Sequence, residues 1–195
     1  MVSATPIELN DPRFKEQNFQ TIEIQPTFDY KKEIWLHHTN NTLQAFKNVL
    51  SKLNNEEAAP LPICVFINST DIIYSLMKQL DLLEESAVFC APKSVDKLKK
   101  NRFCNVYEQW NKDKMKRYNF FTSRFFNAVD MELEEQPHVI MLTDVYFAEH
   151  TMIDPYTDAI QIVGRFRNGV SSITYISNTK KGLPQRSKEE IKGYL

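Results

Sequence analysis

Five short apolar runs, each of strand length and separated by segments with helical periodicity, dominate this sequence. Strands that are apolar on both faces are typical of parallel sheets, and parallel neighbours need crossover connections that are usually helices. The pattern therefore predicts an α/β fold with a mostly parallel sheet covered by helices on both faces. The five runs are PICVFINST (62–70), SAVFCAP (86–92), RYNFFTS (117–123), PHVIMLTD (137–144) and SSITYIS (171–177).

Further elements follow from the same periodicities. Two short strands are predicted at 21–26 and 33–38, and the apolar spacing of 40–53 predicts an amphipathic helix. A second helix is predicted over 154–166, with Gly169 near its C-terminal end. A hydrophobic share of 42% is enough to bury a core for one domain.

Charge and cysteine content exclude several classes of protein. A formal net charge of -1 excludes a constitutively basic nucleic-acid coat, so any phosphate-binding face is expected to be local. Three widely spaced cysteines argue against a disulfide framework and favour a reducing compartment. No secretory or membrane-spanning segment and no metal-ligand spacing is present, so a cytoplasmic protein without a metal site or a membrane partner is expected.

Polar residues follow the predicted strands at their carboxyl ends, where parallel sheets place their ligands. Each group taken singly is explained by helix capping, because Ser, Thr and Asp are preferred cap residues. The four groups are NST (68–70), APKS (91–94), TSRFF (122–126) and TDV (143–145).

Taken together, three segments form a recognisable order. They are a strand ending in Phe66, Asn68 and Ser69, then Thr122 and Ser123 followed by Asp130, then Gln161, Gly164 and Arg165. This order, over roughly residues 20–178, resembles the second RecA-like motor domain of superfamily 2 helicases and translocases. In that family the motifs read Phe-x-Asn-Ser, Thr-Ser-(x)n-Gly-x-Asp and Gln-x-x-Gly-Arg-x-x-Arg.

Two positions depart from the family pattern. Ala128 stands where glycine is usual, and the last arginine falls one position early, at Arg167. The resulting Gly-Arg-x-Arg form is similar to that of some phage- and virus-type DNA helicases, such as the herpesvirus origin-binding proteins.

The resemblance implies a role for each group of residues. Arg165 and Arg167 would be catalytic, contacting the γ-phosphate of ATP held by another domain as arginine fingers. Gln161, Gly164, Asp130 and Ala128 would lie on the nucleotide side, and Gly164 would let its helix pack closely against a neighbouring layer. Single-stranded DNA would be the nucleic-acid partner, held by Asn68, Ser69, Thr70, Thr122, Ser123 and Arg124.

The sequence lacks the loop that would hold ATP. The only glycines are Gly164, Gly169, Gly182 and Gly193, so no Gly-x-x-x-x-Gly-Lys-Ser/Thr motif can be written. We therefore expect ATP and Mg²⁺ to bind only through a partner, an N-terminal RecA-like P-loop domain in the same parent chain or a separate subunit. This chain alone is expected to hydrolyse no ATP. Its predicted parts are a linker (1–20), the RecA-like domain (21–178) and a tail or the start of a further segment (179–195).

Alternatives remain at three levels. Arg165 and Arg167 are also explained as surface charges near a helix C-terminus. A second nucleic-acid surface is conceivable over 93–118, where basic residues alternate with Tyr107, Trp110 and Tyr118, although a solvated helical face is favoured there. Finally, a non-enzymatic RecA-like module that binds nucleic acid or a protein partner is the alternative to a motor domain.

Overall fold

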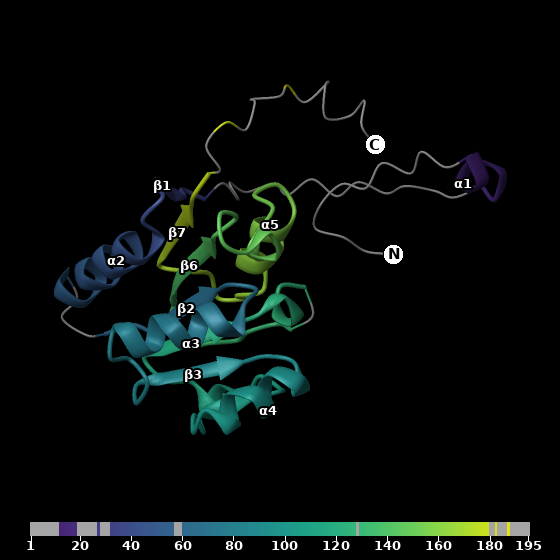
Figure 1. The fold of residues 1–195 in the computed structure, drawn as a ribbon. Helices are drawn as coiled ribbons and strands as arrows, with labels where there is room; N and C mark the ends of the chain where they lie inside the picture. Colours follow the sequence, from purple (N-terminus) through teal and green to yellow (C-terminus); the bar gives the residue numbers. More distant parts are fainter. Residues whose placement is uncertain are drawn as a thin grey trace.

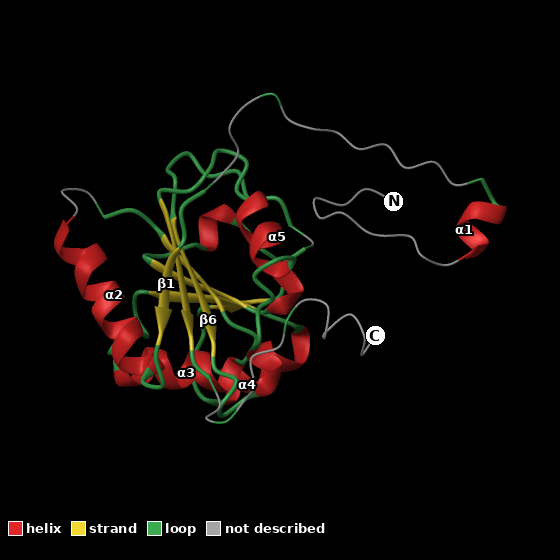
Figure 2. Cartoon of the chain, turned by 90° about the horizontal axis from the view of Figure 1, so that it is seen from above, coloured by secondary structure: helices red, strands yellow, loops and turns green. Residues whose placement is uncertain are grey.

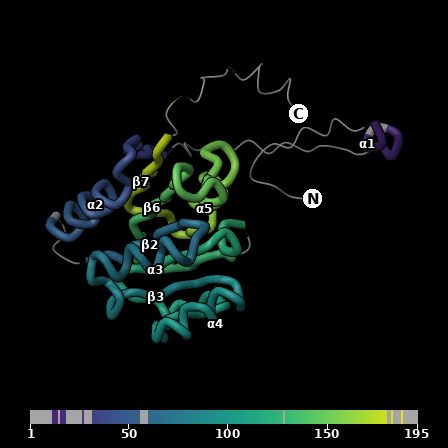
Figure 3. Tube along the Cα trace, viewed as in Figure 1, coloured from purple at the N-terminus to yellow at the C-terminus, as the bar shows by residue number. Residues whose placement is uncertain are grey.

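A seven-stranded sheet, in which every neighbouring pair of strands is parallel, organises the molecule (Figure 1). The computed structural model describes residues 12–18, 27, 32–56, 60–127, 129–179, 182 and 187. The strand order is β1-β7-β6-β2-β5-β3-β4, and the labels of Figure 3 follow it from β7 through β6 and β2 to β3. The strands are β1 (Trp35–His38), β2 (Ile63–Phe66), β3 (Ser86–Phe89), β4 (Val106–Tyr107), β5 (Tyr118–Phe121), β6 (His138–Thr143) and β7 (Ser172–Ser177).

Helices cover both faces of this sheet, and Figure 2 shows α2, α3 and α4 on the side opposite α5. The α-helices are α1 (Pro12–Glu16), α2 (Thr42–Glu56), α3 (Thr70–Gln79), α4 (Pro92–Lys100) and α5 (Asp158–Gly164). The 3₁₀ turns are η1 (Lys112–Lys114), η2 (Ser123–Phe125) and η3 (Glu149–Thr151). This arrangement confirms the predicted α/β class, a parallel sheet with helices on both faces, as a RecA-like domain requires.

The core consists of two clusters, one on each face of the sheet. Successive residues of β2 alternate between them: Ile63 and Val65 pack toward α2, α3 and α4, whereas Cys64 and Phe66 pack toward α5. All four residues are fully buried, which explains why the strand reads as one continuous apolar run.

Three phenylalanine rings form a stack on the α5 face. Phe66, Phe121 and Phe89 are the last residues of the neighbouring strands β2, β5 and β3. The centroid of the Phe121 ring lies 5.0 Å from that of Phe66 and 5.0 Å from that of Phe89, and both pairs are stacked. The stack fixes the spacing of the three strands at the point where their polar exits begin.

Several expected elements differ from the structure. The strand predicted at 21–26 lies outside the described residues, while β1 occupies the end of the run predicted at 33–38. The helix predicted over 154–166 is shorter, because Asp154 forms a turn by accepting the backbone N–H groups of Tyr156 and Thr157. Strand β4 was not predicted at all.

The cysteines are all free thiols, with Cys64 and Cys90 buried and Cys104 exposed.

The seven strands β1 to β7 belong to one sheet. The predicted linker and tail fall mostly outside the described residues, so the predicted domain boundaries stay predictions. Within the described ranges no helix has the length and apolar character needed to cross a membrane.

Candidate functional site: a polar pocket at the carboxyl ends of three strands

Three neighbouring strands end side by side at one edge of the sheet. Each is followed by a helical N-terminus: β2 by α3, β5 by η2 and β3 by α4. The backbone N–H groups of the first turn of a helix point out of its N-terminus and carry partial positive charge. The topology therefore directs the starts of α3 and α4, with η2 between them, toward a common space.

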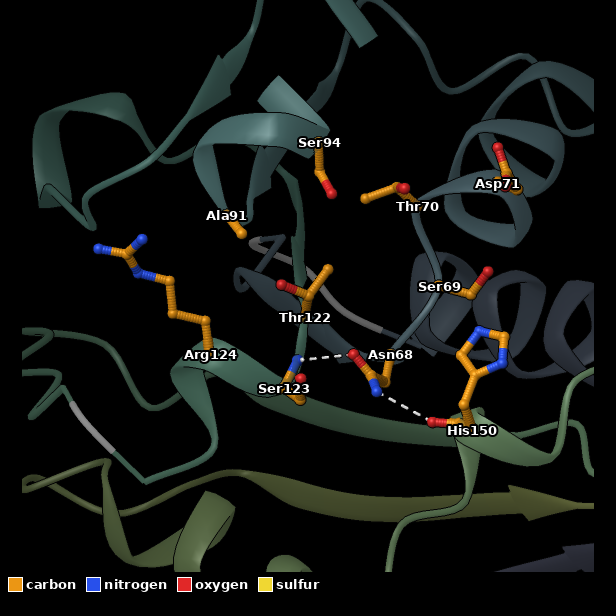
Figure 4. Close-up of a pocket in the computed structure, with 10 residues that line it drawn as sticks. All are labelled: Asn68, Ser69, Thr70, Asp71, Ala91, Ser94, Thr122, Ser123, Arg124 and His150. Carbon is orange, nitrogen blue, oxygen red and sulfur yellow. Dashed lines mark hydrogen bonds between the residues drawn. The ribbon is translucent and has the colours of Figure 1, made fainter. Parts of the chain in front are cut away.

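That space is a pocket of about 240 Å³. All six residues that the sequence predicts for nucleic-acid binding line it, and four further residues complete the wall (Figure 4). The predicted residues are Asn68, Ser69, Thr70, Thr122, Ser123 and Arg124, and the additional ones are Asp71, Ala91, Ser94 and His150.

Asn68 ties together three segments around the pocket. Its side-chain Nδ2 donates to the backbone carbonyl of His150 at 2.9 Å, and its Oδ1 accepts the N–H of Ser123 at 3.4 Å (Figure 4). The exit of β2 is thereby joined to η2 and to the segment that follows β6. Asn68 holds the wall of the pocket in shape, which is a structural role in addition to the predicted contact.

Helix capping accounts for Ser69 but not for the other hydroxyl groups. The Ser69 hydroxyl accepts the N–H of Ile72 at 3.4 Å as the N-cap of α3. By contrast, four side-chain hydroxyls of the pocket form no hydrogen bond with any described residue. They belong to Thr70, Ser94, Thr122 and Ser123. In Figure 4 Thr122 lies in the middle of the group, with Ser94 and Thr70 above it.

The electrostatics of the pocket are weakly positive. Asp71 is neutralised by Lys97, whose Nζ lies 2.6 Å from the carboxylate. Arg124, in contrast, has no acidic partner in the part of the chain that the structure describes. Burial raises the pKa of the Cys90 thiol to about 12, although the charge of Arg124 opposes this shift. Cys90 is therefore a neutral thiol and not a nucleophile.

The predicted nucleotide-side residues form a second cluster. Asp130 accepts hydrogen bonds from Arg165 Nη1 at 3.2 Å and from Arg167 Nη2 at 2.5 Å. Arg165 Nη2 also donates to Gln161 Oε1 at 2.7 Å. The hydrogen bond from Arg167, together with the charges of both arginines, lowers the pKa of Asp130 below its usual value. The Arg165 side chain is 21% exposed and that of Arg167 is 52% exposed.

No hydrogen bond or ion pair between described residues joins this cluster to the pocket, so the predicted residues fall into two groups. The Phe66 ring lies between them. It contacts Phe126, which follows η2, and Phe166, which follows Arg165, at centroid distances of 5.9 and 6.2 Å.

The expectations for two glycines and one alanine have different outcomes. Gly164 was expected to permit close packing of its helix, and this reason is wrong: a Cβ atom built there would meet nothing within 4 Å. Gly169 lies beyond α5 in a turn at φ +85°, in the left-handed region that favours glycine. Ala128 lies outside the described residues.

The alternative surface over 93–118 does not present its aromatic residues to solvent. Tyr118 is buried in β5, and Tyr107 and Trp110 are half-buried against the core on the α5 face. Two of its lysines, Lys97 and Lys112, are paired with acidic side chains. The structure therefore favours the solvated face over a single-strand platform.

Of the pocket residues that were not predicted, Ala91 and Ser94 could have been found from the sequence, whereas His150 could not. Ala91 and Ser94 belong to the polar run that follows β3, and the parallel-sheet rule already directs attention to that run. His150 lies seven positions after the end of β6. Its backbone carbonyl, not its side chain, accepts the hydrogen bond from Asn68, so its residue type gave no signal.

Among the described residues no group of three His, Cys, Asp or Glu side chains is placed to hold a metal ion.

Comparisons with known proteins add little to this geometry. No protein-family model matches the chain, and no curated protein sequence matches it. Three solved chains match its structure. One is the C-terminal domain of the DEAD-box protein Dbp5, with 12% identity and a TM-score of 0.43, over 83% of this chain and 79% of that chain. At this identity and TM-score the likeness supports no inference about function.

Proposed function

We propose that this chain is the C-terminal motor domain of an ATP-dependent DNA helicase or translocase, and that its polar pocket holds the phosphate backbone of the nucleic acid. The observation that carries the proposal is the pocket itself. Four hydroxyls that form no hydrogen bond with any described residue and the N-termini of α3 and α4 line one space of about 240 Å³. Arg124, which has no acidic partner among the described residues, also lines it. Hydroxyls, helix N-termini and arginine are the donors that proteins use toward phosphate oxygens.

ATP and Mg²⁺ would be held by a P-loop domain that this chain does not supply. In this proposal Arg165 and Arg167 act on the charge that develops at the γ-phosphate, with Gln161 and Asp130 orienting them. The hydrogen bonds from Arg165 to Gln161 and Asp130 support an orienting role for these two residues. Gly164 and Ala128 would complete the nucleotide side.

The pocket is tested by measuring the affinity for a fluorescent single-stranded oligonucleotide by anisotropy, over a range of salt concentrations. Thr122→Val removes one hydroxyl at nearly constant shape, so we expect affinity to fall by about five-fold, or about 1 kcal/mol. Arg124→Ala is expected to reduce affinity further and to lower the salt dependence of log K by about 0.7, the contribution of one phosphate contact on a single strand.

Lys78→Ala is the matched control for Arg124→Ala. Lys78 is an exposed cation in the last turn of α3, the helix whose first turn lines the pocket, so the change in net charge is the same. We expect little change in affinity for this variant. Equal affinity of the wild type, Thr122→Val and Arg124→Ala would refute the proposed role of the pocket.

A non-enzymatic module that only binds nucleic acid is the second candidate. The observation that favours it is the double ion pair, since Asp130 already engages both arginines that a motor would use. With a P-loop domain supplied, Arg165→Ala and Arg167→Ala should each cut ATP turnover sharply if the domain is a motor. Unchanged turnover in both variants would favour the binding module.

A further inference from the structure

The loop between β6 and α5, residues 144–157, is built with its polar groups inside. Thr151 is fully buried, and its hydroxyl accepts the Asp144 N–H at 2.8 Å while donating to the Ala148 carbonyl at 2.7 Å. Thr143 Oγ1 accepts the N–H of Ile153 at 3.0 Å. The Asp144 carboxylate is also buried and accepts the N–H of Phe147 at 3.3 Å. These hydrogen bonds fix the loop backbone without using its large apolar side chains.

Two aromatic side chains of the loop lie on the outside, whereas Ile153 is fully buried in the core on the α5 face. Tyr146 is 59% exposed and Phe147 is 79% exposed, and their rings contact each other at a centroid distance of 5.0 Å and an interplanar angle of 72°. Four aromatic side chains are exposed in the described part of the chain, and three of them belong to this loop. They are Trp35, Tyr146, Phe147 and Tyr156. A rigid loop that presents rings to water is a preorganised contact surface.

This aromatic pair lies close along the chain to a wall residue of the polar pocket. His150, three residues after Phe147, lines the pocket, and its carbonyl is held by Asn68 at 2.9 Å (Figure 4). Three residues of extended chain span at most about 11 Å, so the Phe147 backbone lies within that distance of the His150 backbone. A strand whose phosphates occupied the pocket would therefore bring neighbouring bases within reach of the two rings.

We propose that Tyr146 and Phe147 form a base-stacking platform, which makes the ligand a single strand with unpaired bases. This inference rests on the proposed function of the pocket. Every base has a π-face, so stacking on aromatic side chains holds single strands of any sequence, whereas the bases of a duplex are stacked on one another.

The experiment compares two oligonucleotides of equal length, one with normal bases and one fully abasic, by fluorescence anisotropy with the full chain. Phe147→Ala and Tyr146→Ala are each expected to weaken binding of the normal oligonucleotide by about five-fold or more, and to leave abasic binding unchanged. Thr122→Val is expected to weaken both. Trp35→Ala, which removes an exposed aromatic side chain at the first residue of β1, should change neither.

The two proposals fail in different ways. If Phe147→Ala and Tyr146→Ala both bind the normal oligonucleotide as the wild type does while Thr122→Val weakens it, the platform is wrong and the pocket stands. The stacking proposal is also overturned if the wild type binds duplex more tightly than single strands. It is likewise overturned if the aromatic variants lose equal affinity for the normal and the abasic oligonucleotide. If Thr122→Val and Arg124→Ala bind both oligonucleotides like the wild type, the proposed role of the pocket in holding phosphates is refuted, and with it the stacking proposal that rests on it. Binding of a P-loop domain that is lost in Phe147→Ala, with DNA affinity intact, would assign the rings to a protein partner instead.

Discussion

At the scale of single residues, the Asp130 carboxylate is an acid whose pKa is lowered by two neighbouring arginines. The hydrogen bond from Arg167 is the main cause that lowers its pKa, followed by the charges of Arg167 and Arg165. We expect Arg167→Ala to raise the pKa of Asp130 more than Arg165→Ala does, as measured by NMR titration of the side-chain carboxyl carbon. An equal pKa in both variants would contradict the geometry described above.

The same shift has a consequence for stability. Because the pKa of Asp130 is lower in the folded than in the unfolded protein, the ion pair stabilises the fold above the unfolded-state pKa, about 3.9. That stabilisation is lost as the pH falls through the lower folded-state pKa. Asp130→Asn, which cannot ionise, should lack this part of the acid dependence.

At the scale of elements, the buried hydrogen bonds of the 144–157 loop hold its rings in place. Thr151→Val keeps the shape of the side chain but leaves the buried Asp144 N–H without an acceptor. We expect the free energy of unfolding to fall by about 1–3 kcal/mol, the cost of one buried unsatisfied group, as measured by urea denaturation.

Thr157→Val is the matched control for that change. Thr157 is exposed at the start of α5 and its hydroxyl makes no capping bond, so the same substitution should alter stability by less than about 0.5 kcal/mol. A loss of similar size in both variants would mean that the threonine-to-valine change itself is responsible.

At the scale of the whole molecule, the phenylalanine stack joins the three strands that carry the pocket. Phe121 is fully buried at its centre, so Phe121→Ala should lower the free energy of unfolding by about 3–5 kcal/mol in urea denaturation. Phe147→Ala removes the same side chain where it is 79% exposed and should change stability by less than about 0.5 kcal/mol. A small loss at Phe121 would show that the neighbouring rings close the cavity.

The sheet was predictable where its strands are buried on both faces. Strands β2, β3, β5 and β6 are buried at every residue and each falls within a predicted apolar run, because burial on two faces removes polar alternation. Strand β7 also falls within a predicted run but is only partly buried. Strand β4 was missed because its two residues are too few to show any period. The acidic composition of segment 131–136 favours a solvated loop, yet Met131 and Leu133 are buried in the core on the α5 face, and Met131 forms an isolated β-bridge with Phe166.

The pocket was predictable for a topological reason. Parallel strands end at a common edge, so Asn68 and Thr122 could be placed together without knowing any contact. His150 contributes through its backbone, and the outward rings of Tyr146 and Phe147 follow from the buried threonines of their loop. Neither feature leaves a pattern in the linear sequence.

The cysteines make the protein convenient to label. Cys64 and Cys90 are enclosed by the core, and burial raises the pKa of both thiols, so they are inert toward alkylating reagents while the fold is intact. Cys104 is exposed between α4 and β4. A maleimide dye therefore reacts at one position of the native chain, next to the β4 edge of the sheet, with no substitution required.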